Sequence, residues 1–259
     1  MTTGIALATI IHDAAGRLAE PIERAAPALR ALFRGTSASL TEATPPRVAV
    51  LLREVLGARV ATHPVGEEII GRARRDAVAL ALEWGTGHIV YSDFDHMLRW
   101  LEANPGEAGA VLSADPDAAF LVVGRTDRAM AAIPRRLQDT EKPINRAYEL
   151  MTGRRADLLF AVRRMDRATA RDIVAHSRVD SIANDVEWPL LAERLGHRVG
   201  CAEADGLHYR TIDEYGAPAD SYDLDPLQWI RRIEMAAEMA RAMRPYLGGV
   251  AIDGPPRAP

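Results

Sequence analysis

The chain has 259 residues, of which 48% are hydrophobic and 26% are charged, so it can bury a large core and is neither disordered nor fibrous. Its net charge of -4, with acidic and basic residues interspersed, argues against nucleic acid as a partner. The single cysteine, Cys201, excludes an intrachain disulfide, and the first apolar run is too short to cross a bilayer. We therefore expect an untargeted cytoplasmic protein with no transmembrane segment.

Strands and helices are predicted to alternate through the first hundred residues. The expected strands are 4–13, 36–44, 58–64 and 88–95, and the helices between them are 16–35, 47–57 and 67–84. Alternation of this length implies right-handed crossovers in a mostly parallel sheet. The first half of the chain is therefore predicted to be α/β.

The second half contains further strands and helices, and then a polar linker. Strands are expected at 118–127, 156–164 and 197–211, and helices at 168–177 and 185–196. Lys142, the only lysine, directly precedes Pro143 and is expected in a loop. Residues 1–212 are predicted to form one catalytic domain, and 213–259 a linker, a helix from Pro226 to about Leu247 and a disordered tail. The Met-rich face of that helix favours packing on the core, with dimerisation as the alternative.

Two aspartates one residue apart, Asp93 and Asp95, close the predicted strand in "HIVYSDFD". Three interpretations compete: a solvated turn, the N-cap of a helix starting near Met97, or a site for a metal and a phosphate. Ligands of open parallel sheets bind beyond the carboxyl ends of the strands, where this pair lies. Two carboxylates this close repel each other, and a divalent cation would remove that cost while it bridges a diphosphate.

The stretch "GRARRDAVALALEWGTGHIVYSDFD" resembles the GT-A glycosyltransferases, most of all those of the family 2 type, whose DxD motif ends a strand at this place in the fold. A second resemblance lies in "NDVEWPLLAERLGHRV", where Asn184 replaces the first acid of the family's pair. A third is "GLHYRT", which places His208 where several of these enzymes supply a late histidine to the metal. The resemblance spans about residues 4 to 212 and implies a GT-A fold, a mostly parallel sheet flanked by helices.

The resemblance also implies roles for these residues. Asp93, Asp95 and His208 would hold Mg²⁺ or Mn²⁺ against the diphosphate of a UDP- or GDP-linked sugar. Asp185 would accept the proton of the acceptor hydroxyl, and Glu187 is the alternative candidate for this base. The alternatives are that the two aspartates cap a helix, that Asn184 and Asp185 do the same, and that His208 is an ordinary core histidine.

The resemblance also implies contacts with the donor and the acceptor, which we assign by sequence position alone. Nucleotide contacts are expected from Thr9, His12, Asp13 and Glu42, which follow the first two strands. The donor diphosphate is expected to meet one of Arg72, Arg74 and Arg75. Arg125 resembles a Gly-Arg of polyprenyl-phosphate sugar transferases and, with Arg163 and Arg164 after the next strand, points to a small-molecule or lipid-phosphate acceptor.

Two other functions stay open at this stage. A haloacid-dehalogenase-type phosphatase also has two aspartates, one residue apart, at the end of a strand. Its motif has Thr at the position of Met97, however, and its catalytic lysine would have to be Lys142. A non-catalytic nucleotide- or carbohydrate-binding protein of the same fold would keep the site without turnover.

Overall fold

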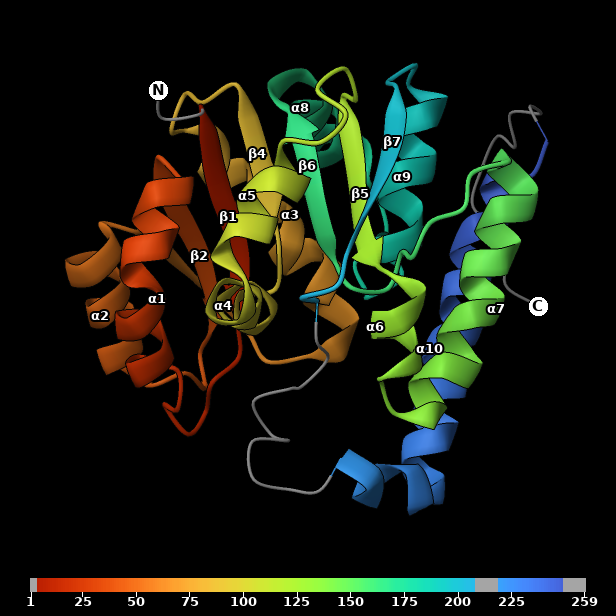
Figure 1. Cartoon of the computed structure of the whole chain (residues 1–259), viewed down its shortest axis with the longest axis horizontal. Coiled ribbons are helices and arrows are strands. Elements are labelled where there is room, and N and C mark those ends of the chain that lie inside the picture. The colour runs from red at the N-terminus through yellow and green to blue at the C-terminus, as the bar shows by residue number, and fades with distance from the viewer. Residues whose placement is uncertain (1–3, 208–218, 249–259) are drawn as a thin grey trace.

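One mixed sheet forms the centre of the protein, whose computed structural model describes residues 4–207 and 219–248 (Figure 1). Within these residues seven strands follow the order β3-β2-β1-β4-β6-β5-β7. The strands are β1 (Ile5–Ile11), β2 (Gly35–Thr41), β3 (Arg59–His63), β4 (His88–Tyr91), β5 (Phe120–Arg125), β6 (Val162–Asp166) and β7 (Val199–Ala204). Only β6 runs antiparallel to its neighbours, β4 and β5. The predicted mostly parallel α/β fold is confirmed.

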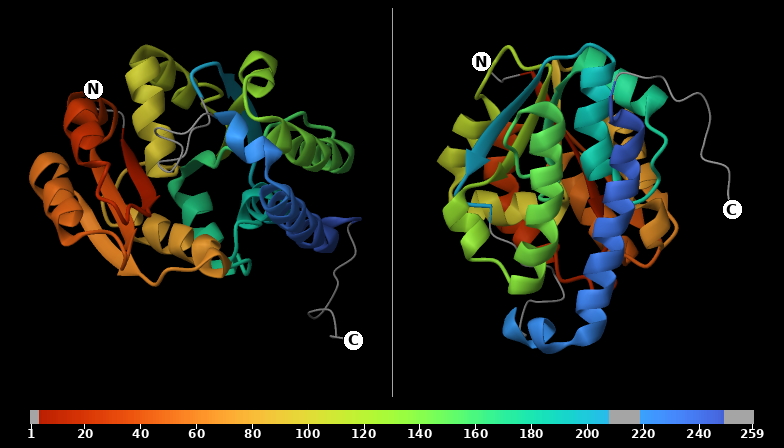
Figure 2. Two further views of the ribbon diagram at one scale, coloured as in Figure 1. Left: turned by 90° about the horizontal axis from the view of Figure 1, so that it is seen from below. Right: turned by 90° about the vertical axis from the view of Figure 1, so that its right-hand side faces the viewer.

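Helices cover both faces of this sheet. They are α1 (Ala19–Leu32), α2 (Pro46–Leu56), α3 (Ile70–Leu82), α4 (Phe94–Ala103), α5 (Pro105–Leu112), α6 (Asp127–Ala131), α7 (Arg135–Thr152), α8 (Arg167–His176), α9 (Asn184–Arg194) and α10 (Pro226–Met243). α1, α2, α4 and α5 pack on one face and α3, α8 and α9 on the other, while α10 lies against α7 and α9 (Figures 1 and 2). In the described residues no helix combines the length and the apolarity that crossing a membrane requires.

Alternation along β1 explains why α3 lies close to the middle of the sheet. Successive side chains of a strand point to opposite faces, so Leu7 enters the core under α1 while Ala6 and Ala8 face α3. The residues of α3 that meet them include Ala77 and Ala81, which are also fully buried. Small side chains on both surfaces allow a close approach, which brings the first turns of α3 to the carboxyl edge of β1 and β4.

The carboxyl ends of β1, β2, β4, β5 and β7 meet at one edge of the sheet, onto which the left view of Figure 2 looks. The chain leaves β1 through α1 on one face and reaches β4 through α3 on the other. The edge between β1 and β4 is therefore a topological switch point, the place where open α/β sheets bind their ligands.

Four local predictions differ from the structure. Lys142 and Pro143 lie inside α7, where Ile144 and Tyr148 anchor the helix in the core beyond the proline. α4 begins at Phe94 rather than near Met97, because both side chains are buried on one helical stripe. Arg163 and Arg164 lie within β6 rather than after it. The last helix ends at Met243, and a 3-10 turn follows it.

Gly71 in the first turn of α3 allows the close contact with the segment that leads into α9. A Cβ atom there would lie 2.4 Å from the carbonyl oxygen of Ser181 and 2.6 Å from that of Val179. These are backbone atoms, so a side chain would have to displace the segment. We expect Gly71→Ala to lower the free energy of unfolding by about 1–3 kcal/mol, measured by urea denaturation.

Gly109→Ala in α5 is the matched control, because its Cβ would meet only Leu32 Cδ1, at 3.9 Å. Replacing a helical glycine in open space should stabilise the protein by roughly 0.5–1 kcal/mol. Equal effects of the two substitutions would show that the contact between α3 and residues 179–181 does not limit packing.

Candidate active site

The guanidinium of Arg74 joins three elements at the switch point. Its Nη1 donates to Asp185 Oδ1 at 2.8 Å and to Asn184 Oδ1 at 2.9 Å, and its Nη2 donates to Asp93 Oδ2 at 2.9 Å. Arg74 comes from α3, Asp93 follows β4, and Asn184 and Asp185 begin α9. The side chain of Arg74 is only 2% exposed, so its charge must be balanced inside the protein.

The two carboxylates that Arg74 binds have opposite pKa shifts. Burial acts to raise the pKa of Asp93, but the charges of Arg74 and His96 and the hydrogen bonds from Tyr91 and Arg74 outweigh it, so this pKa is lowered. Burial also acts on Asp185, where it outweighs the charges of Arg74 and Arg163, so the pKa of Asp185 is raised. Asp93 is therefore fixed as an anion, whereas Asp185 holds a proton more readily than an ordinary aspartate.

Asp95 lies in the first turn of α4, beside the imidazole of His96. His96 Nε2 is 3.9 Å from Asp95 Oδ2, and its ring stacks on Phe160 with the centroids 4.2 Å apart. Burial raises the pKa of Asp95 despite the nearby histidine. Within the described residues no arginine or lysine forms an ion pair with Asp95. Its carboxylate is thus the one of the DxD pair whose burial is least compensated.

The chemistry of this pair suits a hard divalent cation. Oxygen donors of this kind are what Mg²⁺ and Mn²⁺ prefer, and a cation would offset the cost of burying Asp95. Across residues 4–207 and 219–248, however, no three His, Cys, Asp or Glu side chains converge as a metal shell. His208, the third expected ligand, lies outside the described residues, so the shell stays a prediction.

Helix capping does not account for either acidic pair. Asp93 occupies the N-cap position of α4, but its side chain makes no capping hydrogen bond. Ala183 is the N-cap of α9, and Asn184 and Asp185 turn inward to Arg74 instead of capping the helix. Asp93, Asn184 and Asp185 therefore direct side-chain oxygens to the buried guanidinium and not to the ends of the helices.

Glu187, the reserve base, has other partners. Its Oε2 accepts a hydrogen bond from Ser177 Oγ at 2.5 Å and its Oε1 accepts one from the backbone N–H of Arg178 at 2.9 Å. Trp188 Nε1 donates to the same Ser177 hydroxyl at 3.2 Å. Glu187 thus holds the connection between α8 and α9, and its catalytic role stays a prediction without geometric support.

The predicted nucleotide contacts surround the ends of β1 and β2. Thr9 Oγ1 donates to the carbonyl of Ser92 at 2.7 Å and so fixes the backbone just before Asp93. Asp13 accepts from the backbone N–H groups of Arg17 and Leu18, which closes the loop after β1. His12 Nδ1 lies 3.0 Å from Thr41 Oγ1, and Glu42 is exposed beyond β2. Thr9 and Asp13 are occupied within the fold, whereas His12 and Glu42 face solvent at this edge.

The three arginines of α3 have different surroundings. Arg74 is the buried centre of the site, while Arg72 is exposed. Arg75 donates to the carbonyl of Val179 at 2.6 Å and pairs with Asp180, so it holds the segment before α9. Of the three, only Arg72 has its charge turned to solvent, and the predicted contact with a diphosphate stays untested.

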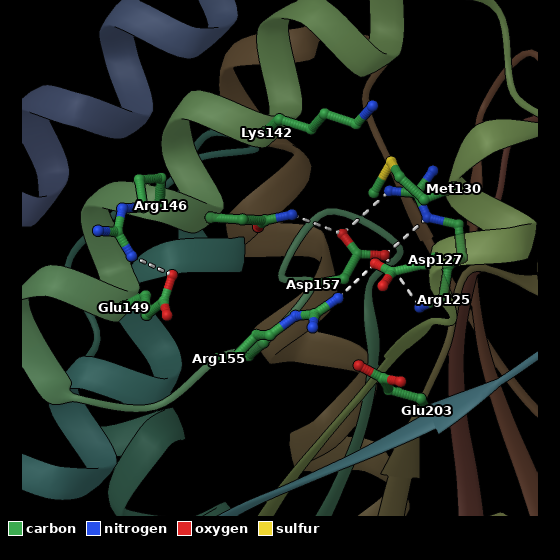
Figure 3. A pocket seen from close by; sticks show the side chains of 11 residues that line it. Arg125, Asp127, Met130, Lys142, Arg146, Glu149, Arg155, Asp157 and Glu203 are labelled. Atoms are coloured by element: carbon green, nitrogen blue, oxygen red, sulfur yellow. Dashed lines mark hydrogen bonds and ion pairs between the residues drawn. The ribbon is translucent and has the colours of Figure 1, made fainter.

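Arg125 at the end of β5 belongs to a second buried charge network. Its Nε donates to Asp157 Oδ2 at 2.7 Å (Figure 3). Its Nη2 donates to Glu141 Oε2 at 2.5 Å. Glu141 also accepts from Arg232 of α10. The Nη1 atom of Arg125 is buried and has no hydrogen-bond partner in the described part of the chain. Arg125 also lines a cavity of about 220 Å³, whose wall includes Lys142 and Arg155. An acceptor phosphate would meet Arg125 only through this cavity.

Arg163 and Arg164 bind backbone carbonyls rather than facing a cavity. Arg163 Nη1 donates to the carbonyl of Val162 at 2.8 Å, and Arg164 Nη1 to those of Leu112 and Ala114 at 3.0 and 2.8 Å. Burial lowers the pKa of both guanidinium groups. Their suggested contact with an acceptor phosphate has no support in this geometry.

Tyr91 and Glu107 contribute to the site but were not predicted from the sequence. Tyr91 donates its hydroxyl hydrogen to Asp93 Oδ1, and its ring lies under the Arg74 guanidinium at 5.4 Å. Glu107 of α5 accepts from the backbone N–H groups of Asp205 and Gly206, at 3.0 and 2.9 Å, and from Trp100 Nε1 at 2.8 Å. Glu107 thereby fixes the chain just before His208. Alternation along β4 could have indicated Tyr91, but no sequence signal links Glu107 to Gly206.

Comparison with known proteins gives a fold but no family. No protein-family model and no curated protein matches the chain. Glucosyl-3-phosphoglycerate synthase from Mycobacterium tuberculosis is similar in structure. Its complex with UDP has 14% identity and a TM-score of 0.52, over 89% of this chain and 80% of that chain. Its complex with Mn²⁺, UDP and phosphoglyceric acid has 14% identity and a TM-score of 0.54, over 94% and 78%. A further mycobacterial protein has 16% identity and a TM-score of 0.54, over 94% and 74%.

These likenesses confirm the GT-A-type fold that the sequence predicted. At such low identities they establish the fold alone.

Replacing Arg74 tests whether the site depends on this guanidinium. Arg74→Met leaves Asp93 and Asp185 without their cation, and we expect it to lower the free energy of unfolding at pH 7 by about 3–5 kcal/mol. The loss should shrink below about pH 4, because protonated carboxyls need no counter-charge. Urea denaturation at several pH values measures both effects.

Arg72→Met is the matched control, since Arg72 lies two residues earlier on α3 and is exposed. It should change the free energy of unfolding by no more than about 0.5 kcal/mol. A loss for Arg74→Met that is small, or that stays constant down to pH 3, would contradict the central role of Arg74.

Proposed function

We propose that this protein is a metal-dependent glycosyltransferase that moves a sugar from a nucleoside diphosphate sugar to an acceptor hydroxyl. One observation carries the proposal: Arg74 gathers the DxD acid Asp93 and the base candidate Asp185 at the switch point of a GT-A-type sheet. The sequence resemblance predicted both acids from separate motifs. Their meeting on one side chain supports the proposal.

The donor is proposed to be UDP-linked, with GDP as the alternative. Solved structures with the same fold hold UDP together with Mn²⁺ or Mg²⁺, which supports this choice. Asp93, Asp95 and His208 are the proposed metal ligands, and Asp93, kept ionised by Arg74, is also proposed to contact the donor. The cation, when bound, neutralises the charge that develops on the departing diphosphate.

Asp185 is the proposed base. The acceptor hydroxyl would give its proton to this carboxylate while the hydroxyl oxygen attacks the anomeric carbon and the bond to the diphosphate breaks, with inversion. The raised pKa of Asp185, caused by burial, makes it a better proton acceptor than an ordinary aspartate. Arg74 holds the carboxylate in one orientation during the transfer.

The acceptor is proposed to be a small molecule that enters beside β5 and β7. A cavity of about 460 Å³ opens there, with Asn104, Arg128 and Asp205 in its wall. A solved structure of the same fold is a complex with phosphoglyceric acid, which supports a small phosphorylated acceptor over a lipid phosphate. The phosphatase alternative has less support, since Lys142 lies on α7 and binds Gln138 of the same helix at 2.8 Å.

Calorimetry with UDP tests the metal site. The parent protein should bind UDP in Mn²⁺, and binding in EDTA should be weaker by about tenfold or more. Asp95→Asn should lose most of this metal dependence. Asp117→Asn, an exposed acid at the opposite edge of the sheet, should behave as the parent. Equal affinity of the parent with and without the metal would overturn the metal-dependent mechanism.

A separate experiment tests the base. In a screen of UDP-sugars with small phosphorylated acceptors, Asp185→Asn should slow nucleotide release by about 10²–10⁴-fold while UDP affinity stays within about threefold. Asn keeps an oxygen for Arg74, so the cluster of Arg74, Asp93 and residue 185 should stay assembled. Glu187→Gln serves as the comparison and should lower stability more than turnover. A parent that binds UDP and Mn²⁺ but turns over none of the donors would favour the non-catalytic binding protein instead.

A further inference from the structure

The outer face of α10 carries an apolar stripe that the rest of the described chain leaves exposed. Figure 2, right, shows α10 along the outside of the molecule beside α7. Its inner face buries Met239 and Met243, whereas Ile230 is 52% and Ile233 56% exposed on the outer face. An amphipathic surface helix normally turns charged residues to solvent, so this stripe is unusual for a monomer.

The stripe has the spacing of a helix-packing seam. Exposed apolar residues follow one another at intervals of three and four along α10: Ile230, Ile233, Ala237 and Ala240. Beyond Met243, in the 3-10 turn and after it, the exposed side continues with the charged Arg244 and the apolar Leu247. Alternating intervals of three and four keep a seam facing a neighbouring helix. The two alanines at its middle allow two helix backbones to approach closely.

Two exposed charges border the stripe, Glu234 and Arg241. They lie seven residues apart, about two helical turns, and so share one side of the helix. Within the described residues no ion pair joins either of them to another side chain, whereas the neighbouring Arg231 pairs with Glu67 and Arg232 with Glu141. Glu234 and Arg241 are therefore available to a molecule that approaches this face.

We propose that a second copy of this chain docks on this face, with its α10 antiparallel. A two-fold axis beside Ala237 places Glu234 opposite Arg241 of the partner subunit, and symmetry repeats that pair. The same axis brings Ile230 over the partner's Leu247. A parallel arrangement would set Glu234 against the partner's Glu234, so the charges select the antiparallel one.

Sedimentation velocity on the full chain tests the dimer. We expect a concentration-dependent mass that rises from 28.3 kDa toward twice that value. Samples from about 5 to about 200 µM bracket the affinities of small interfaces. A parent that stays monomeric over this range overturns the proposal.

Charge reversal identifies the interface. Glu234→Arg and Arg241→Glu should each weaken the dimer by roughly tenfold or more, because each sets like charges against each other twice. The double variant restores both pairs and should dimerise as the parent does. A double variant no better than the single ones contradicts the antiparallel pairing.

Further variants separate this face from other causes of association. Ile233→Asp should abolish the dimer, while Val50→Asp, an exposed valine on α2 beyond the other end of the sheet, should leave it unchanged. A chain that ends at Gly248 should still dimerise, whereas loss of the dimer in that chain would assign the contact to residues 249–259 and overturn the proposal. Thermal melts of each variant confirm that it is folded.

Discussion

The buried positive charge of Arg74 is the constraint on which the site depends. A guanidinium cannot lose its proton at any ordinary pH, so its burial is tolerable only with anions and hydrogen-bond acceptors around it. Asp93 and Asp185 supply the charge, and Asn184 supplies a further oxygen. These residues come from places about 90 positions apart in sequence, so one side chain fixes the relation between β4, α3 and α9. The small residues of β1 and α3 make this possible, because they let the helix carry Arg74 to the edge of the sheet.

A second buried guanidinium, that of Arg125 at the end of β5, is balanced in the same way. Arg125 is bound by Asp157 and Glu141, and Glu141 is shared with Arg232 of α10. The planar fork of arginine suits such bidentate, branching pairs better than a lysine ammonium does. The network links the end of β5 to the last helix of the described chain. Ion pairs therefore connect α10 with the end of β5, beside which the acceptor is proposed to enter.

The sequence predicted the sheet and the acidic residues of the site, but it could not predict which side chains and backbone groups these residues contact. Periodicity located the strands, and the DxD pair was expected at the tip of the fourth of them, where it lies. The antiparallel direction of β6 was missed, because it depends on pairing with β4 and β5. The helical state of Lys142 was missed, because burial of Ile144 and Tyr148 continues α7 beyond Pro143. Arg72, Arg74 and Arg75 were equally good candidates for the contact with the diphosphate. Their sequence positions alone did not show which of the three side chains is buried. Glu107 gave no signal, because its partners are backbone N–H groups almost 100 residues away.

The opposite pKa shifts of Asp93 and Asp185 give the proposed roles a physical basis. Two carboxylates on one guanidinium could have behaved alike, but Tyr91 adds a hydrogen bond to Asp93, and His96 adds a charge beside it. Asp185 has the charge of Arg163 nearby but no hydrogen bond like that from Tyr91. It is also the more deeply buried of the two, with 7% of its side chain exposed against 20% for Asp93. When the environments of two paired acids separate their pKa values, one acid can stay ionised while the other accepts a proton. Asp93, which stays ionised, suits the cation that accompanies the donor diphosphate. Asp185, which holds a proton more tightly, suits the acceptor hydroxyl.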